Sequence, residues 1–163
     1  MGELLQNYLA GATHVVVGKK LDWGLLDGSV GPRVRLLRNT LSARSIQVSA
    51  PHGLPTGSLT VLALIAANPG SSQTALATRA GLNKSALVGI VDQLERRGLV
   101  ERERVATDRR RYEVVVTAKG EETMQELFAV VDAQEQPLRD ALGGRDMATL
   151  LKLLDRAIEA TGK

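Results

Sequence analysis

The chain has 163 residues, no cysteine and a formal net charge of only +3, and 44% of its residues are hydrophobic. This length and composition predict a globular protein with one sizeable core, and the lack of cysteine excludes disulfides and thiolate metal sites. Aromatic residues make up only 2% of the chain, so the core must be aliphatic, which favours packed helices over a β-sandwich.

No apolar run approaches the roughly 20 residues that a membrane span requires. No Lys or Arg precedes Lys19, so the N-terminus lacks the basic start of a signal peptide. The only histidines are His14 and His52, too few for a His-rich metal site. We therefore expect a cytoplasmic chain with no membrane partner, no metal and no cofactor.

Helical periodicity begins at Val30. The preceding residues 1–27 are apolar in places but weakly periodic, and we treat them as an N-terminal extension. Apolar residues then recur at helical spacing and predict a helix over about 29–49, which a run of prolines and glycines ends. Thr56 or Ser58 is placed to cap the next helix.

Residues 72–97 predict a helix-turn-helix. Ser71 or Ser72 can cap its first helix and Asn83 its second, because short side-chain oxygens accept bonds from free first-turn N–H groups. Gly81 can take the positive φ that the turn requires. The helices cross at a small residue, Ala77, and the predicted apolar seam around it comprises Leu76, Leu87, Ile90, Val91 and Leu94.

A β-hairpin over 99–117 follows. Gly98 supplies the left-handed residue that ends the preceding helix, so that Leu99 can fold back on Leu94. The alternation of Tyr112, Val114 and Val116 predicts the buried face of the second strand. Two amphipathic helices over about 118–142 and 145–160 complete the chain, and Pro137 is expected to kink or break the first.

Positive charge is concentrated around this hairpin. Between Arg96 and Arg111 seven arginines stand against three acidic residues. Such a segment suits a surface that faces phosphates, although the charge alone is equally typical of a solvated hairpin.

The outer face of the second helix of the helix-turn-helix is expected to enter a DNA major groove. Lys84 and Ser85 can donate to bases or phosphates there, Val88 can contact a thymine methyl group, and Gly89 permits close approach. The alternative for Lys84 and Ser85 is that they are ordinary first-turn residues. Because few of these side chains make bidentate base contacts, much of the specificity should come from the hairpin and from DNA shape.

Three short motifs follow one another along the chain. Asp92, Leu94, Glu95, Gly98, Leu99 and Val100 form D-x-L-E-x-x-G-L-V, Asp108, Arg109 and Arg110 form D-R-R, and Val116, Thr117 and Gly120 match L-T-x-x-G. Together they resemble the multiple-antibiotic-resistance regulator (MarR) family over about residues 29–160. The resemblance implies a mainly α (α+β) fold: a winged helix-turn-helix domain over 28–163, with a dimerisation region built from the N- and C-terminal helices. Residues 1–27 lie outside the resemblance. A frayed tail is one alternative for them, but because they include several large apolar side chains we expect them to pack on that region.

The resemblance also implies a homodimer on a pseudo-palindromic double-stranded operator. The D-R-R match places Arg109 or Arg110 in a minor groove, whose negative potential attracts arginine, and lets Asp108 hold an arginine in place. A purely structural Asp108–Arg110 pair is compatible with this. The predicted DNA contacts are Thr74, Asn83, Lys84, Ser85, Val88, Gly89, Arg109, Arg110 and Arg111.

The family's usual effector site lies between the dimerisation helices and the DNA-reading lobe. By position, the candidate ligand residues are Arg38, Arg44, His52 and Leu62, and an arginine among them could pair with a carboxylate. For His52 an exposed loop position is the favoured alternative. The resemblance points to a small aromatic acid or a related thioester as the effector.

The sequence thus predicts a dimeric transcriptional regulator, a repressor that a small ligand releases from DNA. The alternative is a winged-helix protein-interaction module that does not touch DNA, but such a module has no need of clustered arginines. An enzyme is not expected, because no Ser-His-Asp set, paired carboxylates or phosphate loop can be proposed.

Overall fold

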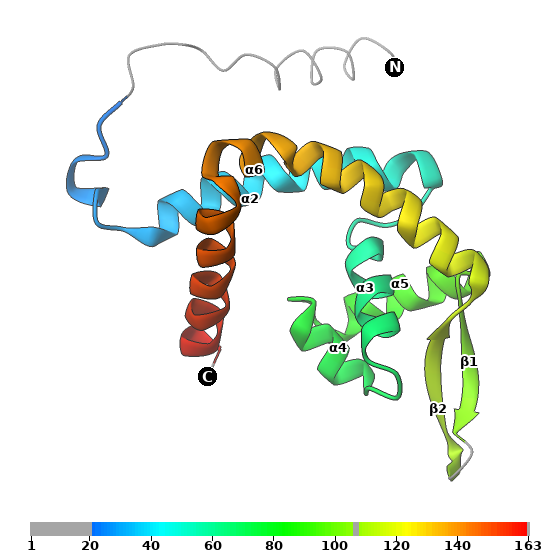
Figure 1. Ribbon diagram of the computed structural model, residues 1–163. Coiled ribbons are helices and arrows are strands. Elements are labelled where there is room, and N and C mark those ends of the chain that lie inside the picture. The colour runs from blue at the N-terminus through cyan, green and yellow to red at the C-terminus, as the bar shows by residue number, and fades with distance from the viewer. Residues whose placement is uncertain (1–20, 106–107, 163) are drawn as a thin grey trace, which may run out of the picture. The chain divides into compact units, whose positions relative to one another are not determined.

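The computed structural model describes residues 21–105 and 108–162, without the side chains of 44–48, 105 and 108–111. The chain divides into two units, residues 1–38 and 39–163, and helix α2 (Val30–Ser49) begins in the first and ends in the second (Figure 1). The predicted helix over 29–49 is therefore confirmed. Its apolar residues Val30, Val34 and Leu37 are nevertheless exposed.

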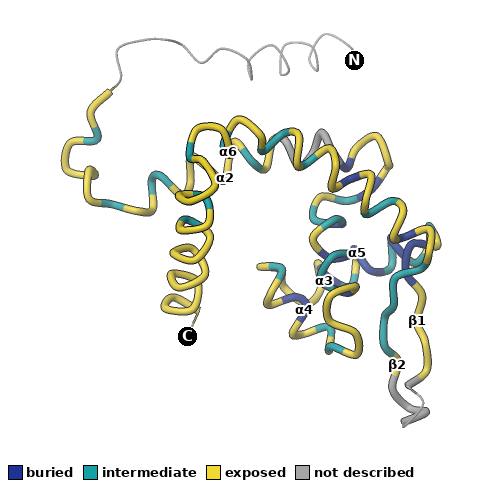
Figure 2. The backbone as a smooth tube through the Cα atoms, in the orientation of Figure 1, coloured by how far each residue is buried: buried dark blue, intermediate teal, exposed yellow. Residues whose placement is uncertain are grey.

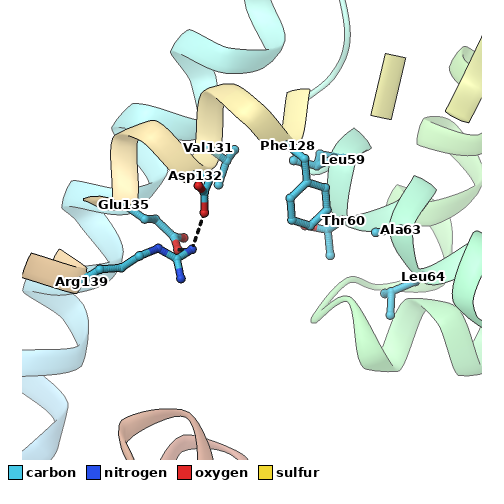
Figure 3. Close-up of a pocket in the computed structure, with 9 residues that line it drawn as sticks. All are labelled: Leu59, Thr60, Ala63, Leu64, Phe128, Val131, Asp132, Glu135 and Arg139. Atoms are coloured by element: carbon cyan, nitrogen blue, oxygen red, sulfur yellow. Dashed lines mark hydrogen bonds and ion pairs between the residues drawn. The ribbon is translucent and has the colours of Figure 1, made fainter. Parts of the chain in front are cut away.

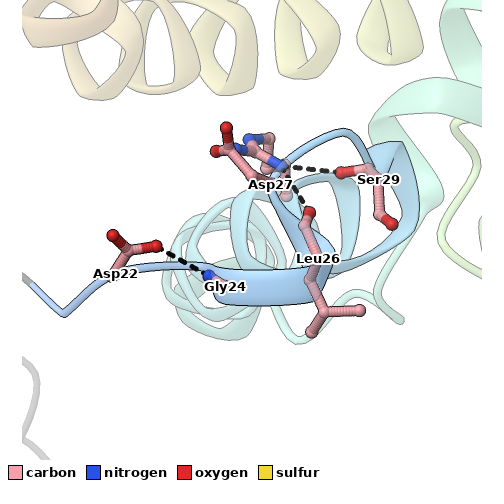
Figure 4. A network of polar contacts seen from close by, with 6 residues as sticks. Asp22, Gly24, Leu26, Asp27 and Ser29 are labelled. Atoms are coloured by element: carbon pink, nitrogen blue, oxygen red, sulfur yellow. Dashed lines mark hydrogen bonds and ion pairs between the residues drawn. The ribbon is translucent and has the colours of Figure 1, made fainter.

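In the first unit a short 3-10 helix, η1 (Gly24–Leu26), is tied to the start of α2 by Arg33. The Arg33 guanidinium donates to the carbonyl oxygens of Leu26 (3.2 Å) and Ser29 (2.8 Å) and to the Asp27 carboxylate (3.0 Å) (Figure 4). Residues 1–20 lie outside the described residues, so the packing of the N-terminal extension stays a prediction.

The second unit holds the helix-turn-helix and the hairpin in the expected order. After a 3-10 turn, η2 (Ala50–His52), come α3 (Ser58–Ala67), α4 (Gln73–Arg79), α5 (Lys84–Arg96), β1 (Val100–Val105), β2 (Asp108–Val116) and α6 (Ala118–Thr161). The buried residues gather where α3, α4 and α5 meet the start of α6 (Figure 2). This core is aliphatic and comprises Leu54, Val61, Leu62, Ile65, Leu76, Ala77, Leu87, Ile90, Val91, Leu94, Leu99, Val100 and Leu127.

The start of α3 differs from the prediction. Neither Thr56 nor Ser58 caps the helix; Gly57 occupies the N-cap position with φ 90°, where it provides no side-chain bond. Ser58 instead lies inside the first turn, where its hydroxyl is buried without a protein partner. The reason is local: the positive φ at Gly57 brings the chain into the helix one residue before a serine could serve as cap.

Both caps of the helix-turn-helix are confirmed. Ser72 Oγ accepts from the N–H of Ala75 at 3.2 Å, and Asn83 Oδ1 accepts from the N–H of Ala86 at 2.7 Å. Gly81 has φ 67°, as the turn requires. Gly81 and the Asn83 cap therefore define the short turn that joins α4 to α5.

The end of α5 is a Schellman motif. The N–H of Leu99 donates to the carbonyl of Leu94 at 3.0 Å and that of Gly98 to Glu95 at 2.8 Å, with Gly98 at φ 69°. Leu94 and Leu99 are both buried, as the sequence predicts. The chain thus turns directly from α5 into β1.

The hairpin is antiparallel, and Val114 and Val116 pack partly buried against the core. The prediction that Tyr112 shares this buried face is wrong, because 56% of its surface is exposed. The hairpin extends beyond the helices (Figure 1), so at Tyr112 no core remains for that face to cover.

Helix α6 begins against the base of the hairpin. Thr117 Oγ1 accepts from the N–H of Gly120 at 3.0 Å and donates to the carbonyl of Gly98 at 2.7 Å. A Cβ at Gly120 would lie 2.0 Å from the carbonyl oxygen of Leu99. The T-x-x-G motif therefore serves a close approach between α6 and the end of α5.

The expected break at Pro137 is also corrected. Pro137 lies inside α6, and the non-helical residue is Gly143, with φ 70° and ψ 166°. Pro137 and Ala133 are both exposed, so water can satisfy the carbonyl that the proline leaves without an N–H. Gly143 reaches a backbone conformation that is open mainly to glycine and separates two helical stretches close to the predicted ones.

Replacing Gly120 by alanine should destabilise the protein. The new methyl group would overlap the Leu99 carbonyl and the Val116 side chain, and overpacking of this kind costs about 1–3 kcal/mol or more. Urea denaturation should show the loss. Gly144→Ala is the matched control, since nothing lies within 4 Å of its Cβ position; equal stability of the two variants would contradict the close approach.

Candidate functional site

Helix α5 presents one polar and one buried face. Leu87, Val91 and Leu94 are fully buried, whereas Lys84, Ser85 and Gly89 on the other side are exposed and Val88 is half-buried. Nothing lies within 4 Å of a Cβ built on Gly89. The predicted DNA contacts on α5 therefore share the accessible side of that helix.

A polar hollow of about 300 Å³ joins this helix to α4 and to the hairpin. It brings together Thr74 and Lys84, two predicted DNA contacts, with Tyr112 of β2. Its remaining lining is Gly70, Ser71, Ser72, Gln73, Glu113 and Val114. Hydroxyl, amide and ammonium donors in this arrangement suit a sugar-phosphate backbone.

Sequence reasoning missed Tyr112 as a site residue. It pairs across the hairpin with Arg104, whose Nε lies 3.2 Å from the Tyr112 hydroxyl oxygen and whose guanidinium carbon lies 5.8 Å from the ring centre. An exposed tyrosine held beside an arginine offers both an aromatic surface and a positive charge. The signal in the sequence was the strand opposite Tyr112. It is rich in arginine, and a strand of that composition does not face a core.

Arg102 fixes the hairpin to the recognition helix. Its guanidinium donates to Asp92 at 2.6 Å and also bonds the carboxylate of Glu95, both on α5. The hydrogen bond to Asp92 is the main cause that raises the pKa of Arg102 above its ordinary value. The D-x-L-E motif thus orients the β1–β2 hairpin, which is the wing of the winged-helix fold.

The tip of the hairpin carries the predicted minor-groove residues. Asp108, Arg109, Arg110 and Arg111 are the first residues of β2. Their side chains lie outside the described residues, so their contacts, and the role predicted for Asp108, stay predictions.

A second hollow, the α3–α6 groove, lies on the same unit and has a volume of about 330 Å³. Leu59, Thr60, Ala63 and Leu64 come from α3, and Phe128, Val131, Asp132, Glu135 and Arg139 come from α6 (Figure 3). The apolar side chains form its walls, and one end is charged. Arg139 there donates to Asp132 at 2.8 Å and to Glu135 at 3.3 Å.

The predicted ligand residues do not line this groove. Leu62 has no exposed surface and belongs to the core, so it is closed to a ligand in this conformation. His52 is exposed beside Arg97 and Lys119 in a separate hollow of about 270 Å³. Arg38 is exposed on α2, and the side chain of Arg44 is not described.

Two absences hold for the described part of the chain. Over residues 21–105 and 108–162 no helix is long and apolar enough to span a membrane. Within the same ranges no group of three or more acidic or histidine side chains could hold a metal ion.

The sequence and the fold are similar to those of known proteins. A sequence model described as the MarR family matches residues 52–111. The structure of the transcriptional repressor CouR bound to a 23-mer DNA duplex is 31% identical, has a TM-score of 0.72, and the match covers 85% of this chain and 99% of that one. The chain belongs to the MarR family.

Two further relatives agree with this assignment. A Thauera aromatica protein proposed to regulate transcription of the hcr operon is 36% identical over 109 residues, which is 67% of this chain and 66% of that protein. CouR from Rhodococcus jostii RHA1, bound to p-coumaroyl-CoA, is 27% identical with a TM-score of 0.69, over 83% of this chain and 93% of that one. The predicted MarR-type winged helix-turn-helix fold is confirmed, and the family is one of transcriptional regulators.

The Arg102 contact predicts a separable effect on DNA binding. Arg102→Gln should cost about 1 kcal/mol of unfolding free energy, as expected for a partly exposed pair, and should weaken DNA binding several-fold because the wing loses its anchor. Fluorescence anisotropy with duplex DNA measures the second effect. Arg145→Gln also removes an arginine, but from an exposed position of α6 away from the wing and outside the α3–α6 groove, so its DNA affinity should stay normal. Equal affinities for the two variants would refute the anchoring role.

Proposed function

We propose that this chain is a dimeric repressor that binds a pseudo-palindromic operator and is released by a small aromatic ligand. The observation that carries the proposal is the alignment of three features on one unit. The accessible face of α5, the polar hollow at Thr74 and Lys84, and the arginine-bearing strands adjoin one another. A recognition helix beside a basic wing suits a major groove with its neighbouring minor groove.

The contacts divide into two kinds. Lys84, Ser85 and Val88 are placed to meet base edges, whereas Thr74 and Tyr112 are placed to meet the backbone. Arg109 or Arg110 enters the minor groove, where electrostatic attraction supplies affinity. The DNA-bound structure of CouR, at 31% identity, supports this arrangement.

Dimerisation explains apolar surface that the single chain leaves exposed. Beyond Gly143, one face of α6 carries Leu151, Leu154 and Ile158, whose surfaces are 56%, 36% and 58% exposed. A soluble monomer seldom exposes this many large apolar side chains on one helix. A second copy that covers them would also set two recognition helices about 34 Å apart, one turn of DNA.

The α3–α6 groove is the proposed effector site. Helix α3 packs in the core against α5, and α6 starts at the base of the wing. A ligand between α3 and α6 that favours a different spacing would shift the dimer toward a state that does not fit DNA. CouR bound to p-coumaroyl-CoA supports an aromatic effector.

Binding to the operator should weaken steeply with salt. Each arginine–phosphate contact that a substitution removes should make the plot of log affinity against log salt concentration less steep by about 1. Arg109→Ala and Arg110→Ala should therefore each reduce both affinity and slope. Arg145→Ala, on α6, is the control and should change neither. A slope that is unaffected by both wing substitutions would contradict a DNA contact at the tip.

The dimer should depend on the distal half of α6. Leu151→Arg with Ile158→Arg places two charges on the proposed interface, which should convert the dimer to a monomer in sedimentation velocity. Lys152→Ala lies on the same helix and should leave the dimer intact. A wild-type protein that sediments as a monomer at micromolar concentration would contradict the proposal.

A further inference from the structure

The polar end of the α3–α6 groove carries more negative than positive charge. Asp132, Glu135 and Arg139 are the only ionisable side chains among its nine lining residues. The same Arg139 nitrogen, Nη2, donates to Asp132 Oδ1 at 2.8 Å and to Glu135 Oε2 at 3.3 Å. The guanidinium is therefore already compensated, and one carboxylate charge remains in excess.

All three charged side chains come from one helix, α6. Positions 132, 135 and 139 lie three and four residues apart and so share a face of α6. The three side chains are between 37% and 63% exposed, so the ion pairs add little to stability. Figure 3 shows the charged cluster at one end of the groove, with Phe128 and Thr60 farther along it. The cluster is thus accessible to whatever enters.

From this charge balance we infer that the groove selects an uncharged aromatic ligand with a hydroxyl donor, and that it disfavours a free aromatic carboxylate. The inference rests on the proposed function, since it names the ligand class of the same groove. Another carboxylate would meet an excess negative charge and, among the nine described residues that line the groove, no cation without a carboxylate partner. A phenol hydroxyl, by contrast, can donate to Asp132 or Glu135, whose carboxylates have lone pairs beyond those used by Arg139.

The walls and the size of the groove agree with a single ring. Phe128, Leu59 and Val131 supply apolar surface for an aromatic face. A cavity of about 150 Å³ lined by apolar side chains holds benzene, so a groove of about 330 Å³ admits one ring with a short substituent. Of the two effector classes open from the sequence, the groove suits the aromatic acyl end of a thioester, in which the acid is masked, better than a free acid.

Two probes of nearly equal size separate the alternatives. Calorimetric titration of the full chain at neutral pH should give a Kd for 4-hydroxybenzamide about tenfold or more below that for 4-hydroxybenzoate, a difference set by one charge. A third probe, 4-methoxybenzamide, lacks the hydroxyl donor and should bind more weakly than 4-hydroxybenzamide.

The preference should reverse when Arg139 is freed. The double variant Asp132→Asn with Glu135→Gln leaves the guanidinium without a carboxylate partner in the groove, so it can pair with the carboxylate of 4-hydroxybenzoate. Asp140→Asn is the matched control: Asp140 lies on the same helix, accepts from Gln136 and does not line the groove. This variant should retain the wild-type preference.

The outcomes separate the inference from the proposed function. If the unmodified protein binds 4-hydroxybenzoate as tightly as the amide, binds neither probe, or shows no reversal in the double variant, the selectivity is refuted. Anisotropy with operator DNA on the same preparations tests the repressor itself. Normal DNA binding with the wrong ligand preference overturns only this inference, whereas absent DNA binding overturns the proposed function.

Discussion

The junction at Leu99 holds the DNA-reading elements together. Its N–H closes the Schellman motif of α5, and its carbonyl accepts from the N–H of Thr117 at 3.1 Å. That carbonyl also faces Gly120, where no Cβ could be accommodated. The recognition helix, the wing and α6 therefore meet within a few ångströms of one backbone group. Neighbouring contacts extend this constraint, since Arg102 ties β1 to α5 and Thr117 ties α6 to Gly98.

The same junction gives a physical link between the two candidate sites. Helix α6 leaves it at Gly120 and goes on to line the groove from Phe128 to Arg139. Helix α3 supplies the opposite wall and, through Val61 and Leu62, packs in the core that supports α5. A ligand that separates α3 from α6 would therefore act on helices already coupled to the recognition helix. No long series of intermediate residues is needed to connect the groove with the recognition helix.

The sequence predicted what local chemistry decides. Asn83 begins a helix and Gly98 ends one, each through hydrogen bonds to residues a few positions away. Their roles could therefore be predicted from the sequence. Tyr112 could not, because its burial depends on how far the hairpin extends beyond the core. The groove was missed for the same reason: Leu62 and Phe128 look equally apolar in sequence, but packing buries the first and leaves the second at the groove. Pro137 was overestimated as a break, since an exposed helix tolerates a lost N–H.

A hydroxyl-radical footprint on duplexes selected from a random library by the full chain tests the central claim most directly. If α5 and the wing act as one unit that a dimer presents twice, two protected patches should lie on one face of the DNA, with centres about 10 base pairs apart. Minor-groove protection should accompany each patch. A single patch, or no selected sequence at all, would contradict the account.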